Sequence, residues 1–158
     1  MKKLFKIFIT MLTLSTLIIG CGSNSITLKS GVSISDVVRT IVENNEVTMP
    51  EIADDTIAES IFYLNLDDVE EYSIEFSMVN VSSDNVALVK AKDGKTEDIK
   101  KSLKKRLEDV RSQFQYYLPD QFEKVENAQI YVKGNYVLLA IVNDSEKAID
   151  ILNENLTN

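Results

Sequence analysis

A single cysteine is the residue whose setting most directly predicts chemistry. Cys21 directly follows Leu17-Ile18-Ile19-Gly20, the end of an apolar segment preceded by Lys2, Lys3 and Lys6. A basic start, a short apolar middle and a small residue at the cut are the parts of a secretory signal. The pattern predicts a bacterial lipobox, with signal cleavage between Gly20 and Cys21 and lipid attached to Cys21.

Two other interpretations of this segment are an ordinary cleaved signal and an uncleaved membrane anchor. The apolar stretch is interrupted by threonine and serine and is shorter than the roughly 20 apolar residues of a comfortable membrane span, which argues against the anchor. The lipobox is favoured because the single cysteine of the chain directly follows Ile-Ile-Gly. We therefore predict a signal peptide over residues 1–20, a lipidated cysteine and polar tether over 21–31, and one domain over 32–158. The uncleaved signal should form an apolar helix apart from the domain.

Two absences narrow the chemistry that this chain can perform. It has no histidine, and its one cysteine is assigned to the lipid. Histidine-based acid–base catalysis, thiol nucleophiles, disulfides and ordinary zinc sites are therefore excluded. We expect no enzyme activity, no catalytic residue, no metal site and no cofactor.

The charge of the chain is acidic and unevenly distributed. Cleavage of the signal would remove three of the 17 basic residues. The remaining chain would have 14 basic and 25 acidic residues, a net charge of −11. Such a surface argues against a nucleic-acid partner. Residues 36–84 contain one basic residue, Arg39, whereas 95–111 are rich in lysine and arginine, so we expect the basic helix to face the acidic half.

Three short motifs resemble parts of known active sites. Gly94-Lys95-Thr96 lacks the earlier glycine of a phosphate-binding loop, because Val89 stands there. Ser102-Leu103-Lys104-Lys105 and Ser83-Asp84-Asn85 match two motifs of penicillin-recognising enzymes, but in the wrong order and without the third. We interpret Gly94 as a turn residue and the other two motifs as chance matches.

Two further groups of residues could bind ligands. The acidic pairs Asp54-Asp55, Asp67-Asp68 and Glu70-Glu71 carry oxygen ligands for calcium, but no calcium-loop spacing is present. Tyr131 and Tyr136 could form a sugar-binding platform on a sheet face. For both groups we favour the simpler interpretation, which is a solvated edge for the acids and core packing for the tyrosines.

The periodicity of apolar residues predicts an α+β domain. Helical spacing occurs in four segments and strand-like alternation or apolar runs occur in two hairpins. The helices are expected over about 33–44, 56–62, 96–118 and 144–156, and the hairpins over 73–92 and 129–142. In outline the order is α-ββ-α-ββ-α, a single antiparallel sheet of two hairpins with helices packed mainly on one face. Arg106 borders the apolar stripe of the third helix, and we expect its head group to reach a carboxylate.

Several of these segments resemble a known family. They are the lipobox, Phe62-Tyr63, Lys90-Ala91-Lys92-Asp93, Arg106 with Tyr117-Leu118-Pro119, Asn127-Ala128 and Gly134-Asn135-Tyr136. Together they resemble the bacterial lipoproteins grouped as domain of unknown function 4358. The resemblance implies a membrane-anchored extracytoplasmic α+β domain and brings no catalytic or binding residues with it.

The sequence thus predicts a location more firmly than an activity. We expect a lipoprotein on the extracytoplasmic face of the cell membrane, held by lipid on Cys21, whose non-catalytic domain binds a protein or cell-envelope partner. The alternative is a carboxylate-dependent cell-envelope hydrolase or a divalent-cation-binding domain. A weaker third interpretation is a solute-binding module, which would need a sizeable apolar pocket.

Overall fold

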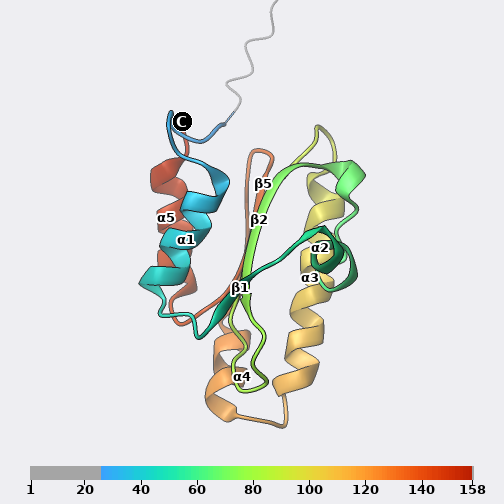
Figure 1. Cartoon of the computed structure of the whole chain (residues 1–158), viewed down its shortest axis with the longest axis vertical. Coiled ribbons are helices and arrows are strands. Elements are labelled where there is room, and N and C mark those ends of the chain that lie inside the picture. The colour runs from blue at the N-terminus through green and yellow to red at the C-terminus, as the bar shows by residue number, and fades with distance from the viewer. Residues whose placement is uncertain (1–25, 158) are drawn as a thin grey trace, which may run out of the picture.

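An antiparallel five-stranded sheet forms the centre of the molecule (Figure 1). The structure, a computed structural model, describes residues 26–157. Within this part the strands lie in the order β1-β2-β3-β5-β4. Their bounds are Pro50–Ile52 for β1, Val69–Ser77 for β2, Asn85–Ala91 for β3, Gln129–Lys133 for β4 and Tyr136–Ile141 for β5.

Helices cover both faces of this sheet. On one face lie α1 (Ile34–Asn44) and α5 (Ser145–Asn155); on the other lie α2 (Asp55–Ser60) and α3 (Thr96–Phe114) (Figure 1). A short helix, α4 (Pro119–Glu126), follows α3 directly, and a 3-10 turn spans Leu66–Asp68. The central strands must therefore bury side chains on both sides, which explains why every residue of β5 is buried.

The two faces carry separate hydrophobic cores. Beneath α2 and α3, Phe62, Phe114 and Leu103 pack on alternate residues of the sheet such as Ile74. Beneath α1 and α5, Ile41 and Leu152 pack on the intervening residues, such as Leu88. Each sheet residue thus serves the core on its own side, as the alternation of side chains along a strand requires.

The predicted fold class is confirmed, with one correction. The domain is α+β, its antiparallel sheet contains both predicted hairpins, and Val132 pairs with Val137 and Ile130 with Leu139 as expected. The expectation that helices pack mainly on one face is wrong, because α1 and α5 cover the second face. The sequence also did not reveal strand β1 or helix α4, and α3 ends at Phe114 rather than 118.

Both ends of the described chain lie at one end of the domain, which we call the proximal end (Figure 1). Leu28 forms a β-bridge with Leu156, and Thr27 exchanges hydrogen bonds with Thr157. Residues 27–29 therefore belong to the folded domain, although the sequence placed them in the tether. The opposite end, where α4 lies, is called the distal end below. The predicted signal helix, Gly20 and Cys21 fall outside the described residues, and no helix within 26–157 is long and apolar enough to cross a membrane.

The turn between β4 and β5 gives a test of this fold. Gly134 has a φ of +59°, and a Cβ added there would stand 3.1 Å from Cβ of Ile26. Replacing Gly134 with alanine should therefore lower the free energy of unfolding by about 1–2 kcal/mol in urea denaturation, from backbone strain and the close contact.

Gly31→Ala is the matched control. Gly31 also has a positive φ, of +83°, but nothing lies within 4 Å of an added Cβ. The control should be the milder of the two changes. Equal losses of stability would contradict the packing of residue 26 against the hairpin.

Candidate functional site

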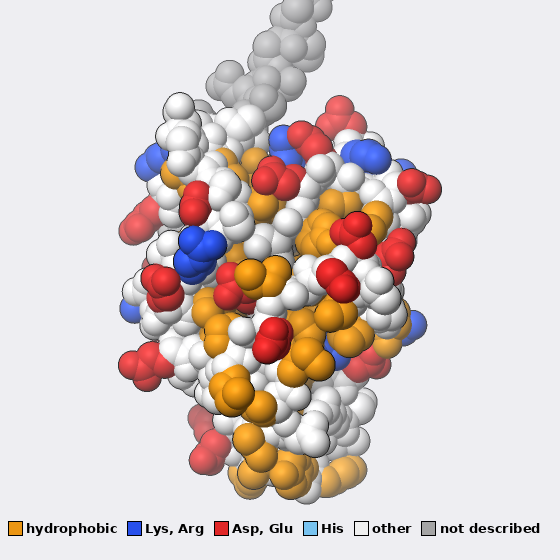
Figure 2. Space-filling model, viewed as in Figure 1, with side chains coloured by type: hydrophobic (Ala, Val, Ile, Leu, Met, Phe, Trp, Pro, Cys, Tyr) orange, Lys and Arg blue, Asp and Glu red, His pale blue; other side chains and the backbone are white. Residues whose placement is uncertain are grey.

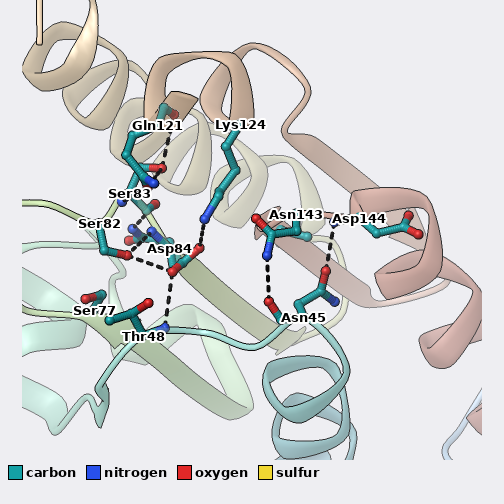
Figure 3. Close-up of polar contacts among 12 residues, drawn as sticks. Asn45, Thr48, Ser77, Ser82, Ser83, Asp84, Gln121, Lys124, Asn143 and Asp144 are labelled. Atoms are coloured by element: carbon teal, nitrogen blue, oxygen red, sulfur yellow. Dashed lines mark hydrogen bonds and ion pairs between the residues drawn. The ribbon is translucent and has the colours of Figure 1, made fainter. Parts of the chain in front are cut away.

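A buried carboxylate organises the polar residues near the distal end (Figure 3). Asp84, 2% exposed, lies in the loop between β2 and β3. One oxygen pairs with Nζ of Lys124 on α4 at 2.5 Å, and the other accepts hydrogen bonds from the Ser82 hydroxyl at 2.7 Å and the Thr48 backbone N–H at 3.3 Å. This carboxylate thereby joins the segment before β1, the β2–β3 loop and α4.

The neighbouring residues extend the same network. The backbone N–H and the hydroxyl of Ser83 both donate to Gln121 on α4, and the side-chain N–H of Asn85 donates to the Ser83 carbonyl at 3.0 Å. Every fully buried side-chain nitrogen and oxygen in residues 26–157 has a hydrogen-bond partner. A satisfied network of this kind holds the loop in one conformation.

Arg106 lies beside this network and is half-buried on α3. Its Nε donates to Oδ1 of Asn85 at 2.9 Å, and its guanidinium carbon stands 5.1 Å from the centre of the Phe62 ring. No carboxylate within residues 26–157 forms an ion pair with it, so the expectation of a carboxylate partner is wrong. Burial lowers the pKa of Arg106 from its ordinary value, and the nearby charge of Asp109 opposes that shift.

A small cavity opens next to this guanidinium, and we call it the arginine pocket. Its volume is about 160 Å³. Besides Arg106, its lining includes Ser77, Asn85 and Gln113 as polar residues and Phe76, Met78 and Phe114 as apolar ones. The pocket thus combines one cation with a partly apolar wall.

Exposed apolar side chains gather on the face shown in Figure 2, from the middle of the molecule to its distal end. We call them the apolar surface. Each is at least 50% exposed, and Tyr116 reaches 93%. Its residues are Met49, Ile52, Met78, Val81, Tyr116 and Tyr117.

The apolar surface is continuous with a groove between α3 and α4. The groove has a volume of about 500 Å³, and its lining includes Phe114, Tyr116, Tyr117, Pro119 and Phe122. Met78 lines the arginine pocket as well, and a hollow beside Val81 is completed by the first residues of α4. The pocket and the groove therefore both open along the apolar surface.

Two residues at this surface adopt a backbone conformation that is unusual for their type. Met49 has a φ of +47°, and Leu118, directly before α4, has a φ of +51°. A side chain in the left-handed region costs roughly 1 kcal/mol or more. The fold holds both residues there, and the effect is to keep Met49 at the surface and to turn the chain sharply from α3 into α4.

The three active-site-like motifs have structural roles. Ser83-Asp84-Asn85 forms the polar network just described, and the Ser102 hydroxyl donates to the Tyr63 carbonyl at 2.7 Å. Gly94 has a φ of +76° in the turn before α3, which confirms that it is a turn residue. The structure does not bring the two penicillin-enzyme motifs together by any hydrogen bond among the described residues.

The acidic pairs are mostly engaged in local contacts. Asp54 caps α2, Asp55 accepts a hydrogen bond from Tyr72, Asp68 pairs with Lys95 at 2.9 Å and Glu70 pairs with Lys90 at 2.5 Å. Within the described range, no group of three or more acidic or cysteine residues could hold a metal ion. The contact of Lys95 with Asp68 brings the start of the basic helix against the acidic half, as expected.

The tyrosines of the second hairpin pack into the core, as the sequence favoured. Tyr136 is buried, and its hydroxyl accepts a hydrogen bond from the Leu28 N–H at 3.3 Å. Tyr131 packs against the same core, and its hydroxyl donates to Asn153. Neither ring forms a free platform for a sugar.

The sequence did not reveal the residues of the apolar surface. Met78 directly follows β2, which ends at Ser77. Met49 and Val81 lie in connections between elements, where there is no periodic pattern. Tyr116 and Tyr117 fell inside the helix predicted over 96–118, but α3 ends at Phe114. The only available signal was the occurrence of large apolar residues inside turn-rich segments.

Comparison with known proteins identifies the family of this chain but no individual relative. A family model described as "Domain of unknown function (DUF4358)" matches residues 43–142. The chain belongs to this family, which confirms the resemblance of the sequence. The matched region includes all five strands, the arginine pocket and the apolar surface. No curated protein and no solved structure matches the chain.

The buried ion pair of Asp84 and Lys124 gives a test of the network. Replacing Asp84 with alanine leaves a buried ammonium unpaired and should cost about 3–5 kcal/mol of unfolding free energy. Replacing Lys124 with methionine in the same chain should recover much of that loss, because no buried charge is then unpaired.

Glu70→Ala is the control, because its ion pair with Lys90 is more exposed and should be worth at most about 1 kcal/mol. Urea denaturation of the unchanged protein and the three variants measures these differences. A loss for Asp84→Ala no larger than that of the control would contradict the role assigned to the network.

Glu75 on β2 gives a pH-dependent test. Burial raises the pKa of Glu75; the positive charge of Arg39 opposes this shift and the negative charge of Glu43 adds to it. An acid whose pKa is higher in the folded state destabilises the fold once it is ionised. Glu75→Gln should therefore be more stable than the unchanged protein at pH 7. The difference should vanish as the pH falls below the ordinary glutamate value of about 4.3.

Thermal unfolding of both proteins between pH 3.5 and 8 would measure this dependence. Glu51→Gln, at an exposed position on the neighbouring edge strand, is the control for the change of side chain and should alter the stability at pH 7 less than Glu75→Gln does. A stability difference that grows as the pH falls would contradict the assignment for Glu75.

Proposed function

We propose that this protein is a lipid-anchored extracytoplasmic binding domain that docks a protein partner through its apolar surface. The observation that carries the proposal is the gathering of exposed methionine, tyrosine and aliphatic side chains at one region of an otherwise acidic domain. Contiguous exposed apolar patches on soluble domains mark interaction sites, and tyrosine and methionine are enriched at protein interfaces.

The position of the apolar surface supports a partner away from the membrane. A lipid on Cys21 would hold the proximal end, because Ile26 begins the described chain there. Five Cα–Cα steps from Cys21 to Ile26 span at most about 18 Å. The apolar surface runs toward the opposite end of the domain, where its side chains are available to a partner in the extracytoplasmic space.

The form of the surface favours docking through side chains over the addition of a β-strand. The edge strand β1 is three residues long and begins with Pro50, which has no backbone N–H to offer. A short edge that contains proline is a poor template for another strand. The exposed rings and the groove beside α4 offer a partner's side chains an apolar seat.

Photo-crosslinking in cells would test the partner. A benzoylphenylalanine at position 116 should yield an adduct with a protein of another sequence, because Tyr116 is the most exposed residue of the apolar surface. The same probe at position 101 is the control, since Lys101 is also exposed but lies on α3, away from the apolar surface. Equal adducts at both positions, no adduct, or adducts only between copies of this chain would each contradict the proposal.

Cys21→Ser tests the anchor. The variant should lose incorporation of radiolabelled fatty acid and should leave the membrane fraction, because one hydroxyl cannot take the place of the lipidated thiol. Retention of the variant in the membrane, without label, would indicate that the N-terminal segment is itself the anchor.

A further inference from the structure

Most of the hydrogen-bond donors of the Arg106 guanidinium are unused. Nε is used by Asn85, but the two terminal nitrogens donate no hydrogen bond to any residue in the described part of the chain. Arginine stays charged under all ordinary conditions. The half-buried guanidinium therefore carries a positive charge that no anion among the described residues is paired with. The Phe62 ring at 5.1 Å and the bond to Asn85 fix the plane of the group.

A second polar side chain lines the same cavity. The Gln113 side chain lines the pocket and makes no hydrogen bond within residues 26–157. The terminal nitrogens of Arg106 and the Gln113 side chain thus line one cavity without a hydrogen-bond acceptor among the described residues.

The charge and size of the pocket define the anion. Arg106 is the one basic residue in the lining of the pocket. Lys124, which lies nearby, is paired with Asp84. A doubly charged phosphate would leave excess negative charge next to Asp109 in an acidic domain. A carboxylate carries one charge and matches the guanidinium fork with two parallel hydrogen bonds. The volume of about 160 Å³ leaves room for such a group and a few carbon atoms.

The wall of the pocket defines what carries the anion. Phe76, Met78 and Phe114 line it together with the polar donors, and Met78 belongs to the apolar surface. We infer that the arginine pocket binds a carboxylate attached to an apolar group, held by the guanidinium of Arg106. The inference rests on the proposed function in one respect, since the pocket opens along the surface at which the partner would dock. The carboxylate comes either from a small acid or from the C-terminus of a protein.

Ligand-observed NMR titration of the purified full chain, in a non-ionic detergent, would test this assignment. Butyrate represents the small acid and N-acetyl-leucine the peptide C-terminus; butyramide and N-acetyl-leucinamide are their uncharged controls, with detergent alone as the blank. Both carboxylates should bind, and each amide should bind about tenfold or more weakly, the cost of losing a charge-assisted hydrogen bond. The tighter of the two acids identifies the source.

Two variants separate binding from folding. Arg106→Lys keeps the charge but loses the fork, and should weaken binding by about tenfold. Gln113→Glu adds a like charge at an exposed position of the lining and should weaken binding about threefold or more. Gln115→Glu makes the same change on an exposed residue that does not line this pocket, and should have little effect.

Several results would overturn the inference. They are equal binding of acids and amides, tighter binding of inorganic phosphate than of either acid, no saturation at millimolar acid, or equal effects of the two glutamate variants. The small probes need no partner, so their failure leaves the crosslinking result at position 116 intact. Failure of the crosslink would contradict the proposed docking of a protein but would not change the result of the titration.

Discussion

The buried carboxylate of Asp84 is the constraint on which the arrangement of the distal end depends. A charge that is 2% exposed is tolerated only with partners, and it obtains them from three segments that are distant in sequence: Thr48, Ser82 and Lys124. By drawing these segments together it fixes the β2–β3 loop, from which Met78 and Val81 project. The same loop leads into β3, whose first residue, Asn85, accepts a hydrogen bond from Arg106. The apolar surface and the arginine pocket are thus two consequences of one satisfied charge.

Sequence periodicity predicted the regular elements because each of them buries a repeating face. The Gly134 turn and the register of Val132 with Val137 follow from local turn chemistry and alternation. Sequence periodicity could not show that two helices cover the second face of the sheet. The apolar runs of β3 and β5 indicate buried strands but do not show which helices cover each face. The short strand β1 is exposed at every position and has no apolar pattern to detect. Arg106 is half-buried beside the apolar stripe of α3, as its position in the sequence indicated. Its actual partners, Asn85 and Phe62, depend on tertiary contacts that the sequence does not show.

The domain joins two properties that suit a tethered receptor. Its proximal end gathers the first and last described residues through the pairing of Leu28 with Leu156. Its other end combines exposed rings, an apolar groove and a cation with unused donors. Apolar area supplies much of the affinity at protein interfaces, whereas a single oriented charge supplies selectivity. A partner with an apolar contact and one carboxylate would satisfy both features, and the absence of histidine from the chain is no obstacle to such a role.

Oxidative footprinting tests the central claim, that the apolar surface is covered by a partner in the cell. Hydroxyl radicals oxidise exposed methionine and tyrosine, so Met49, Met78 and Tyr116 report on the surface, while Tyr131 on the opposite edge strand serves as the internal reference. In membranes isolated from cells that make the protein, the first three residues should be oxidised more slowly than in the purified protein, and Tyr131 at an unchanged rate. Equal rates in membranes and in the purified protein at all four residues would contradict the account.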